Sequence, residues 1–250
     1  MNVGYFKLFL DCQGQGEPTI ILENGLGYSS WNDGSLYNYK AFTRTCLYYR
    51  AGMNNETLTG WRTTEDQVQD LHALIKNAGI PGPYILVGHS IAGYNLALYT
   101  SHYPEQVAGL VCVDCRVPMF DKNMLDALGA EQSDESQEVK DYRKFLTQGV
   151  ENVEYLDIVA SGVQAEKVTS LGDVPLVVLV AEKSITPDPP ASQLYILDGK
   201  IWLEFSEAFS KFSSRGRMEI VPGVDHGSIL YSDAVTKAIQ EVVDAARQTP

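Results

Sequence analysis

Residues 84–93 read Tyr-Ile-Leu-Val-Gly-His-Ser-Ile-Ala-Gly, and this stretch decides the expected fold. Its first four residues are apolar, as in a strand that is buried on both faces of a parallel sheet. A glycine and a histidine then lead to Ser90, and the small residues Ala92 and Gly93 begin a segment typical of a helix. A strand, a tight turn with serine at its apex and a helix form a nucleophile elbow, from which the hydroxyl projects.

The stretch departs from the common form of this motif at one position. The usual pattern has glycine two residues after the serine, whereas Ala92 holds that place here and Gly93 follows. Alanine is still small enough for a turn in which backbone segments approach closely. The helix N-terminus behind Ser90 also favours negative charge that develops there. The sequence therefore predicts that Ser90 is a catalytic nucleophile.

Strands and helices alternate through the rest of the chain. Apolar runs bounded by turn residues predict buried strands at 19–22, 44–49, 84–87, 109–114, 174–180 and 218–221. This alternation predicts an α/β fold with a mostly parallel twisted sheet and helices on both faces. Residues 3–11 alternate in polarity and predict an edge strand. We expect one domain over residues 1–250, with a small helical cap inserted at about 117–173.

The loops that follow the predicted strands are where a ligand site is expected. In open α/β sheets the ligand lies at the carboxyl ends of the strands. Because parallel strands end at the same edge of the sheet, these loops should gather there; they are 23–27, 88–91, 114–118, 181–190 and 223–227.

Composition limits the partners and the setting. A net charge of −13 in 250 residues argues against nucleic acid and anionic membranes as partners. No apolar run approaches membrane-spanning length, and no basic segment followed by an apolar one is seen at the N-terminus. The four cysteines are scattered over strand-like segments, so we expect reduced core residues and a cytoplasmic setting. No metal-ligand spacing and no dinucleotide fingerprint appears, so neither a metal nor a cofactor is expected.

Along nearly its whole length the sequence resembles the α/β-hydrolase superfamily. It looks most like compact bacterial esterase-like members, with Pro-Gly-Pro-Tyr-Ile-Leu-Val-Gly-His-Ser before the elbow helix. In that family the triad follows the chain order serine, acid, histidine. The resemblance implies Ser90 as nucleophile and His226, in the loop after the last strand, as base. A serine hydroxyl needs such a base, because it is a poor nucleophile until an imidazole takes its proton.

The acid of the triad has two candidates in this sequence. Family members usually carry aspartate shortly after the strand that here is 175–181, but Ser184 stands at that place and Asp188 follows in a proline-rich loop. Some relatives instead place the acid after the strand that follows the elbow helix, where this chain has Asp114. We prefer Asp114, because a rigid strand holds it, and keep Asp188 as the alternative. A structural role for Asp114, bonding loop amides, is also open.

The resemblance also implies an oxyanion hole made of two backbone N–H groups. One belongs to Ile91, directly after the nucleophile, and the second is assigned to Leu26, in the loop where family members usually have a His-Gly sequence. A substrate pocket between these loops and the cap is expected to be lined by Leu26 and Ile91 together with Trp31, Met119, Phe120 and Leu125. Each of these side chains is equally compatible with a place in the core.

The predicted function is a serine hydrolase that cleaves a small or medium, uncharged carboxylic ester or lactone through an acyl-enzyme. Serine rather than aspartate at the elbow argues against haloalkane and epoxide chemistry, which need a carboxylate nucleophile. Two alternatives remain: an acyltransferase that uses the same triad, and a non-catalytic binding or receptor protein on the same fold. The expected partner is a small-molecule ester, and the oligomeric state is not predicted.

Overall fold

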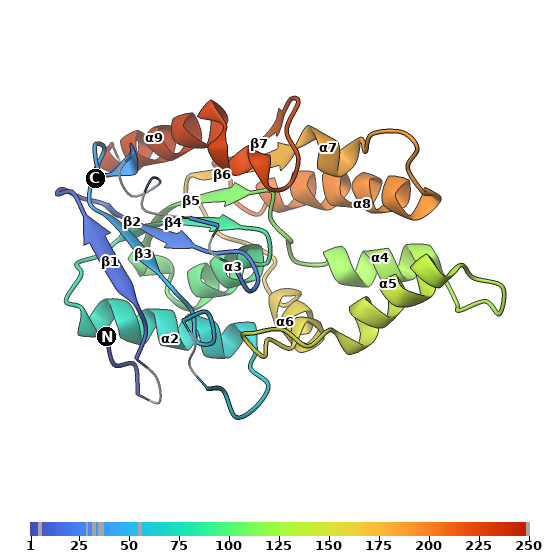
Figure 1. Ribbon diagram of the computed structural model, residues 1–250. Coiled ribbons are helices and arrows are strands. Elements are labelled where there is room, and N and C mark those ends of the chain that lie inside the picture. The colour runs from blue at the N-terminus through green and yellow to red at the C-terminus, as the bar shows by residue number, and fades with distance from the viewer. Residues whose placement is uncertain (5–6, 29, 32–33, 35–37, 55–56, 249–250) are drawn as a thin grey trace.

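The computed structural model describes residues 1–4, 7–28, 30–31, 34, 38–54 and 57–248. Within these residues seven strands form one sheet, in the order β1-β3-β2-β4-β5-β6-β7 (Figure 1). Strand β1 pairs with β3 in the antiparallel sense, and every other neighbouring pair is parallel. The strands are β1 Leu10–Gln13, β2 Thr19–Glu23, β3 Thr45–Tyr48, β4 Tyr84–His89, β5 Val107–Val113, β6 Leu176–Ala181 and β7 Gly216–Val221.

Helices cover both faces of this sheet (Figure 1). The α-helices are α2 Thr64–Asn77, α3 Ala92–His102, α4 Phe120–Leu128, α5 Gln137–Gln148, α6 Ile158–Ala165, α7 Glu182–Ile185, α8 Gln193–Ser210 and α9 Asp233–Arg247, with short 3₁₀ helices at Pro104–Gln106 and Ser228–Tyr231. Leu86 of β4 packs in a core with α2, α3 and α8. Its neighbours Ile85 and Val87 pack in a second core with α9. Because successive side chains of a strand point to opposite faces, a strand between two helical layers is apolar throughout. The predicted mostly parallel α/β architecture is confirmed.

The region expected to form a cap, 117–173, contains α4, α5 and α6, and these helices lie beyond the carboxyl ends of the strands (Figure 1). The N-terminal expectation was less accurate. The edge strand predicted at 3–11 is observed only at Leu10–Gln13, and residues 5–6 lie outside the described residues. The backbones of Met1 and Leu8 hydrogen-bond to each other at 2.6 and 2.8 Å, so this segment folds back on itself before the sheet begins.

The expectation of four reduced cysteines is wrong for this structure, which joins them in two disulfides, Cys12–Cys46 and Cys112–Cys115. The antiparallel register of β1 and β3 sets Cys12 opposite Cys46, with Cα atoms 4.0 Å apart. The turn at the end of β5 brings Cys112 and Cys115 to a Cα separation of 5.6 Å. The cytoplasmic setting, which relied on reduced cysteines, stays a prediction. Across the described residues, no helix is both long enough and apolar enough to span a membrane.

Candidate active site

Ser90 sits at the turn between β4 and α3 with a φ of 58°, a left-handed conformation that is uncommon for residues with a side chain. Hydrogen bonds on both sides of the peptide hold it there. The Ser90 N–H donates to the Val113 carbonyl at 3.3 Å, and the Ser90 carbonyl accepts from the N–H groups of Arg116 at 2.8 Å and Gly93 at 3.1 Å.

The displaced glycine of the elbow has a steric explanation. A Cβ atom on Gly93 would lie 2.3 Å from the carbonyl oxygen of Arg116, so the chain that crosses the start of α3 requires glycine there. Gly88, on the strand side of the turn, leaves room for the Ala92 methyl group, because a Cβ atom on Gly88 would lie only 3.0 Å from that methyl. The elbow therefore keeps its close backbone approach with glycine one residue later than usual.

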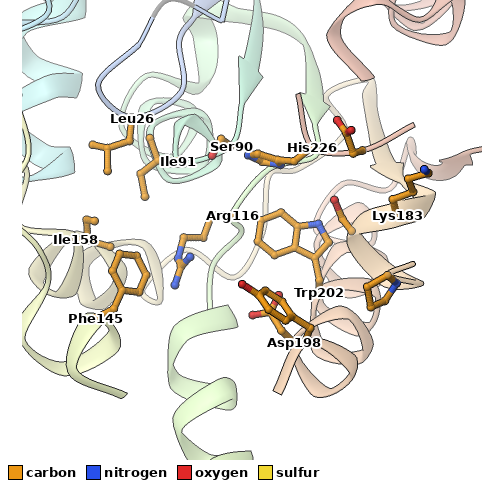
Figure 2. Close-up of a pocket in the computed structure, with 14 residues that line it drawn as sticks. Leu26, Ser90, Ile91, Arg116, Phe145, Ile158, Lys183, Asp198, Trp202 and His226 are labelled. Carbon is orange, nitrogen blue, oxygen red and sulfur yellow. The ribbon is translucent and has the colours of Figure 1, made fainter. Parts of the chain in front are cut away.

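Ser90 lines a cavity of about 410 Å³ at the carboxyl ends of the strands (Figure 2). All five loops expected at this edge contribute to it. Helices α5, α6 and α8 complete the wall, which is lined by Leu26, Ser90, Ile91, Arg116, Phe145, Ile158, Lys183, Ser184, Pro187, Tyr195, Asp198, Trp202, Asp225 and His226. A volume of this size is in the range of sites for small-molecule ligands.

His226 lies in this wall and is tied to Asp114 behind it. The Nδ1 atom of His226 and the Oδ2 atom of Asp114 are 2.7 Å apart. The Asp114 side chain is fully buried, whereas that of His226 is 43% exposed. Among the described residues, the Ser90 hydroxyl forms no hydrogen bond, and it faces the same cavity as the imidazole.

Besides His226, three groups donate hydrogen bonds to the Asp114 carboxylate. Oδ1 accepts from the Ala181 N–H and the Trp202 indole N–H, each at 3.0 Å, and Oδ2 accepts from the Ser184 hydroxyl at 2.7 Å. Burial alone would raise the pKa of Asp114, but the bonds from His226, Ser184 and Ala181 bring it below its ordinary value of 3.8. Asp114 therefore stays ionised at neutral pH.

The structure separates the two candidate acids. Asp188 is 74% exposed and forms an ion pair at 2.8 Å with Lys183, whereas Asp114 bonds to His226. Ser184, which stands where the family usually has aspartate, reaches the same carboxylate by its hydroxyl. The register of β5 and β6 explains this arrangement, because Val113 pairs with Leu179 and the ends of the two strands are therefore adjacent.

His89, the residue between glycine and serine in the elbow, connects two loops of the site. The Gly25 N–H donates to Ser30 Oγ at 2.7 Å, and Ser30 Oγ lies 2.9 Å from His89 Nδ1. His89 Nε2 lies 2.8 Å from the carbonyl oxygen of His226, which can only accept, so the ring proton is on Nε2 and Nδ1 accepts from the Ser30 hydroxyl. Burial, followed by the proximity of His226, lowers the pKa of His89 to about 4, so the ring is neutral in this role.

The backbone donors predicted for an oxyanion hole, Leu26 and Ile91, are close to the nucleophile in the cavity wall. Within the described residues neither of their N–H groups donates a hydrogen bond, although neighbouring amides in both loops do. Two unbonded N–H groups beside a serine hydroxyl are the donors that a developing oxyanion requires. Their side chains form part of the apolar lining, as expected.

The rest of the predicted pocket lining was wrong. All four side chains are described, and none lies in the cavity wall: Trp31, Met119, Phe120 and Leu125. Trp31 is fully buried in the core on the α9 side and donates its indole N–H to the Glu23 carbonyl at 2.7 Å. Phe120 packs edge-on behind Trp202 with ring centroids 5.0 Å apart. Met119 directly precedes α4 with a φ of 72°, and Leu125 packs against the main core. Besides Leu26 and Ile91, the apolar lining comes from α5, α6 and α8.

Sequence reasoning missed the charged residues of the wall, and each of them has a partner. Arg116 pairs with Asp121 and stacks over the rings of Phe120 and Phe145 at 5.0 and 5.1 Å. Asp198 accepts from the Tyr142 hydroxyl, and Lys183 pairs with Asp188. The predicted strand-end loops 114–118 and 181–190 include Arg116 and Lys183, but nothing in the sequence marked these side chains as part of the wall. Asp198 comes from α8, whose position depends on the whole fold.

Comparison with known proteins agrees with this fold. The chain matches the sequence profile of a family described as "Alpha/beta hydrolase family" over residues 11–244. Similar solved structures include a thermophilic esterase from Thermogutta terrifontis, with 18% identity, a TM-score of 0.66 and coverage of 96% of this chain and 93% of that chain. A putative lipase from Acinetobacter baumannii AYE has 15% identity and a TM-score of 0.69 over 100% of this chain and 91% of that one.

A structure from work on carboxylesterases of the thaumarchaeon Nitrososphaera gargenis is similar at 15% identity and a TM-score of 0.67, over 97% of this chain and 96% of that chain. At such identities these structures show a common fold. A curated relative, the probable transporter efuK of Hormonema carpetanum, is 33% identical over 125 residues, which are 46% of this chain and 18% of that protein. The chain thus spans less than a fifth of that relative's length.

Proposed function

The chain belongs to the alpha/beta hydrolase family, and from that premise we propose that it is a serine hydrolase of small or medium, uncharged carboxylic esters or lactones. One observation carries the proposal: His226, in the wall of the cavity that Ser90 faces, is bonded at 2.7 Å to the buried and ionised Asp114. A serine, a histidine and a carboxylate bonded to that histidine are the parts of a catalytic triad for acyl transfer.

In the proposed reaction each group has one task. The bond from Nδ1–H to Asp114 leaves the Nε2 atom of His226 without a proton, so it can take the proton of Ser90 as the hydroxyl attacks the ester carbonyl. The N–H groups of Leu26 and Ile91 stabilise the oxyanion of the tetrahedral intermediate. His226 then returns the proton to the leaving alcohol, and water releases the acyl group from Ser90 by the same steps.

The lining of the cavity supports an uncharged substrate. Its apolar side is formed by Leu26, Ile91, Phe145 and Ile158. Arg116 and Asp198, in the wall, already bond to Asp121 and Tyr142, so an ionic substrate group would have to compete with those partners. A non-catalytic receptor was plausible mainly because the usual acid position holds Ser184. Because Asp114 is bonded to His226, the serine at the usual acid position no longer favours a non-catalytic receptor.

The proposal is tested by a panel of p-nitrophenyl esters and lactones together with a fluorophosphonate probe. We expect the wild-type protein to hydrolyse short-chain esters and to be labelled at Ser90, and Ser90→Ala to lose both properties while keeping its circular dichroism spectrum. Ser101→Ala, which changes an exposed serine near the end of α3, is the matched control and should behave as wild type. Label on another serine, or turnover by Ser90→Ala, would overturn the assignment. Products formed with added alcohols separate hydrolysis from acyl transfer.

A further inference from the structure

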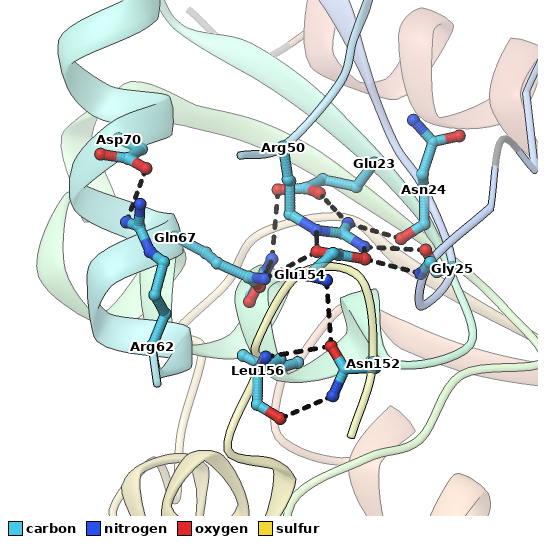
Figure 3. Close-up of polar contacts among 12 residues, drawn as sticks. Glu23, Asn24, Gly25, Arg50, Arg62, Gln67, Asp70, Asn152, Glu154 and Leu156 are labelled. Carbon is cyan, nitrogen blue, oxygen red and sulfur yellow. Dashed lines mark hydrogen bonds and ion pairs between the residues drawn. The ribbon is translucent and has the colours of Figure 1, made fainter. Parts of the chain in front are cut away.

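Three charged side chains meet in the interior beside the Ser90 cavity, and the proposed reaction does not use them (Figure 3). Glu23 ends β2, Arg50 follows β3, and Glu154 comes from the insertion between β5 and β6; their side chains are 1%, 2% and 0% exposed. Arg50 donates from Nη1 to Glu23 at 2.9 Å, and from Nε and Nη2 to the two oxygens of Glu154 at 2.6 and 2.9 Å. Buried ion pairs of this kind are often no more stabilising than apolar residues of similar size. Stability alone therefore does not account for them.

Two members of this charged cluster, Arg50 and Glu154, hydrogen-bond to the backbone of the loop 24–27, which follows β2. Arg50 donates to the carbonyl oxygens of Asn24 at 2.6 Å and Gly25 at 2.8 Å. The Gly27 N–H donates to Glu154 Oε1 at 2.6 Å. Gly27 has a φ of 70°, and the amide before it, that of Leu26, is the one left without an acceptor among the described residues. The loop is thus held on both sides of the N–H group that the proposed reaction needs.

Glu154 is itself held in a tight loop of the insertion. The Asn152 side-chain oxygen accepts from the N–H groups of Glu154 at 3.2 Å and Leu156 at 3.0 Å, and its amide donates to the Leu156 carbonyl at 2.9 Å (Figure 3). The loop also docks closely on the chain after β3. A Cβ atom on Gly52 would lie 2.3 Å from the Val153 carbonyl oxygen, so glycine is required there for the contact.

We propose that Glu154 is a positioning residue for the oxyanion hole: directly through Gly27 and indirectly through Arg50, it fixes the loop 24–27 so that the Leu26 N–H points at the oxyanion. The inference rests on the proposed function, because it assigns a task within that reaction. It also gives the insertion a role besides lining the cavity. The helices that cover the substrate and the loop that stabilises the transition state are joined by one buried carboxylate.

The test is Glu154→Gln, which keeps the size of the side chain and removes its charge. A small displacement of a catalytic donor costs rate steeply, so we expect kcat for p-nitrophenyl butyrate to fall by roughly 10- to 100-fold with KM nearly unchanged. A trifluoromethyl ketone, which forms a tetrahedral adduct with the serine, should lose affinity by a similar factor. Amide hydrogen exchange at Gly27, followed by NMR, should become faster in the variant.

The matched control is Asp70→Asn. It breaks a different, partly buried ion pair, at 2.6 Å between Asp70 of α2 and Arg62, and Asp70 has no bond to the loop 24–27. It should leave kcat, inhibitor affinity and Gly27 exchange as in wild type. Should Glu154→Gln not fold, Asn152→Ala decides the question, because it keeps all three buried charges and loosens only the loop that carries Glu154; a smaller loss of kcat with faster Gly27 exchange is expected.

The outcomes separate the two proposals. A folded Glu154→Gln or Asn152→Ala protein with a lower melting temperature but wild-type kcat, inhibitor affinity and Gly27 exchange would overturn the positioning role and leave Glu154 as a structural residue. A wild-type protein that neither hydrolyses esters nor is labelled at Ser90 would overturn the proposed function instead. In that case unchanged Gly27 exchange in the variants would still count against the link between Glu154 and the loop, and faster exchange would support it.

Discussion

Replacing Asp114 by asparagine is the most discriminating test of the proposed triad. The four donors around the carboxylate decide how the amide would sit. Oδ1 faces two groups that can only donate, the Ala181 N–H and the Trp202 indole, so the amide oxygen has to stay on that side. The NH₂ group would then face Ser184 and His226, where the carboxylate now accepts bonds at 2.7 Å.

This orientation predicts the wrong tautomer of His226. An NH₂ group beside Nδ1 donates to it, so the ring proton moves to Nε2 and the nitrogen facing Ser90 can no longer accept a proton. The corresponding change in serine proteases lowers kcat by about 10⁴-fold. We expect the same scale here, which corresponds to about 5.4 kcal/mol of transition-state stabilisation.

Initial rates with p-nitrophenyl butyrate, with Ser90→Ala as the blank, measure the effect. Asp188→Asn is the matched control, since Asp188 is 74% exposed and its ion pair with Lys183 is of the kind that contributes little. It should retain activity within about twofold of wild type, as surface pairs are worth ~1 kcal/mol or less. Near-wild-type turnover by Asp114→Asn would refute the reasoning, and a large loss in Asp188→Asn would move the acid to the later loop.

Three further predictions concern the groups around this centre. Ser184→Ala should lower kcat by roughly three- to tenfold in the same assay, because it removes one hydrogen bond to a charged acceptor; unchanged kcat would mean that the hydroxyl is dispensable. His89→Asn should lower kcat more than it raises KM, since the bond from the ring to the His226 carbonyl is lost; an effect on KM alone would contradict a positioning role. Because the folded pKa of Asp114 lies below its unfolded value of 3.8, its carboxylate stabilises the fold above that pH and this contribution disappears as the pH falls through the lowered pKa. Urea unfolding of wild type and Asp114→Asn should therefore differ at pH 7 and converge toward pH 3, whereas a constant difference would exclude this linkage.

Local patterns were sufficient for the architecture and for the elbow. A buried parallel strand has to be apolar on both faces, and a left-handed turn at close quarters needs small residues, so both features are visible within a few consecutive residues. The positions of Ser90 and of the loops at the strand ends followed from that alone. At residues 3–11, where the pattern was weak, only Leu10–Gln13 joins the sheet, while Leu8 hydrogen-bonds to the backbone of Met1, which alternation in polarity does not exclude.

Contacts between distant segments were decided only by the tertiary structure. Asp114 reaches His226 because β5 pairs with β6 and β6 with β7, with Val113 opposite Leu179 and Ala181 opposite Val221. No property of any of these strands taken alone specifies those registers. The pairing of Cys12 with Cys46 depends in the same way on the register of β1 and β3. The side chains that line the cavity from α5, α6 and α8 come from helices whose placement depends on packing across the whole sheet edge. An apolar residue such as Trp31 satisfies the hydrophobic effect equally well in the core or in a pocket, so its place is decided by the surrounding fold rather than by its own chemistry.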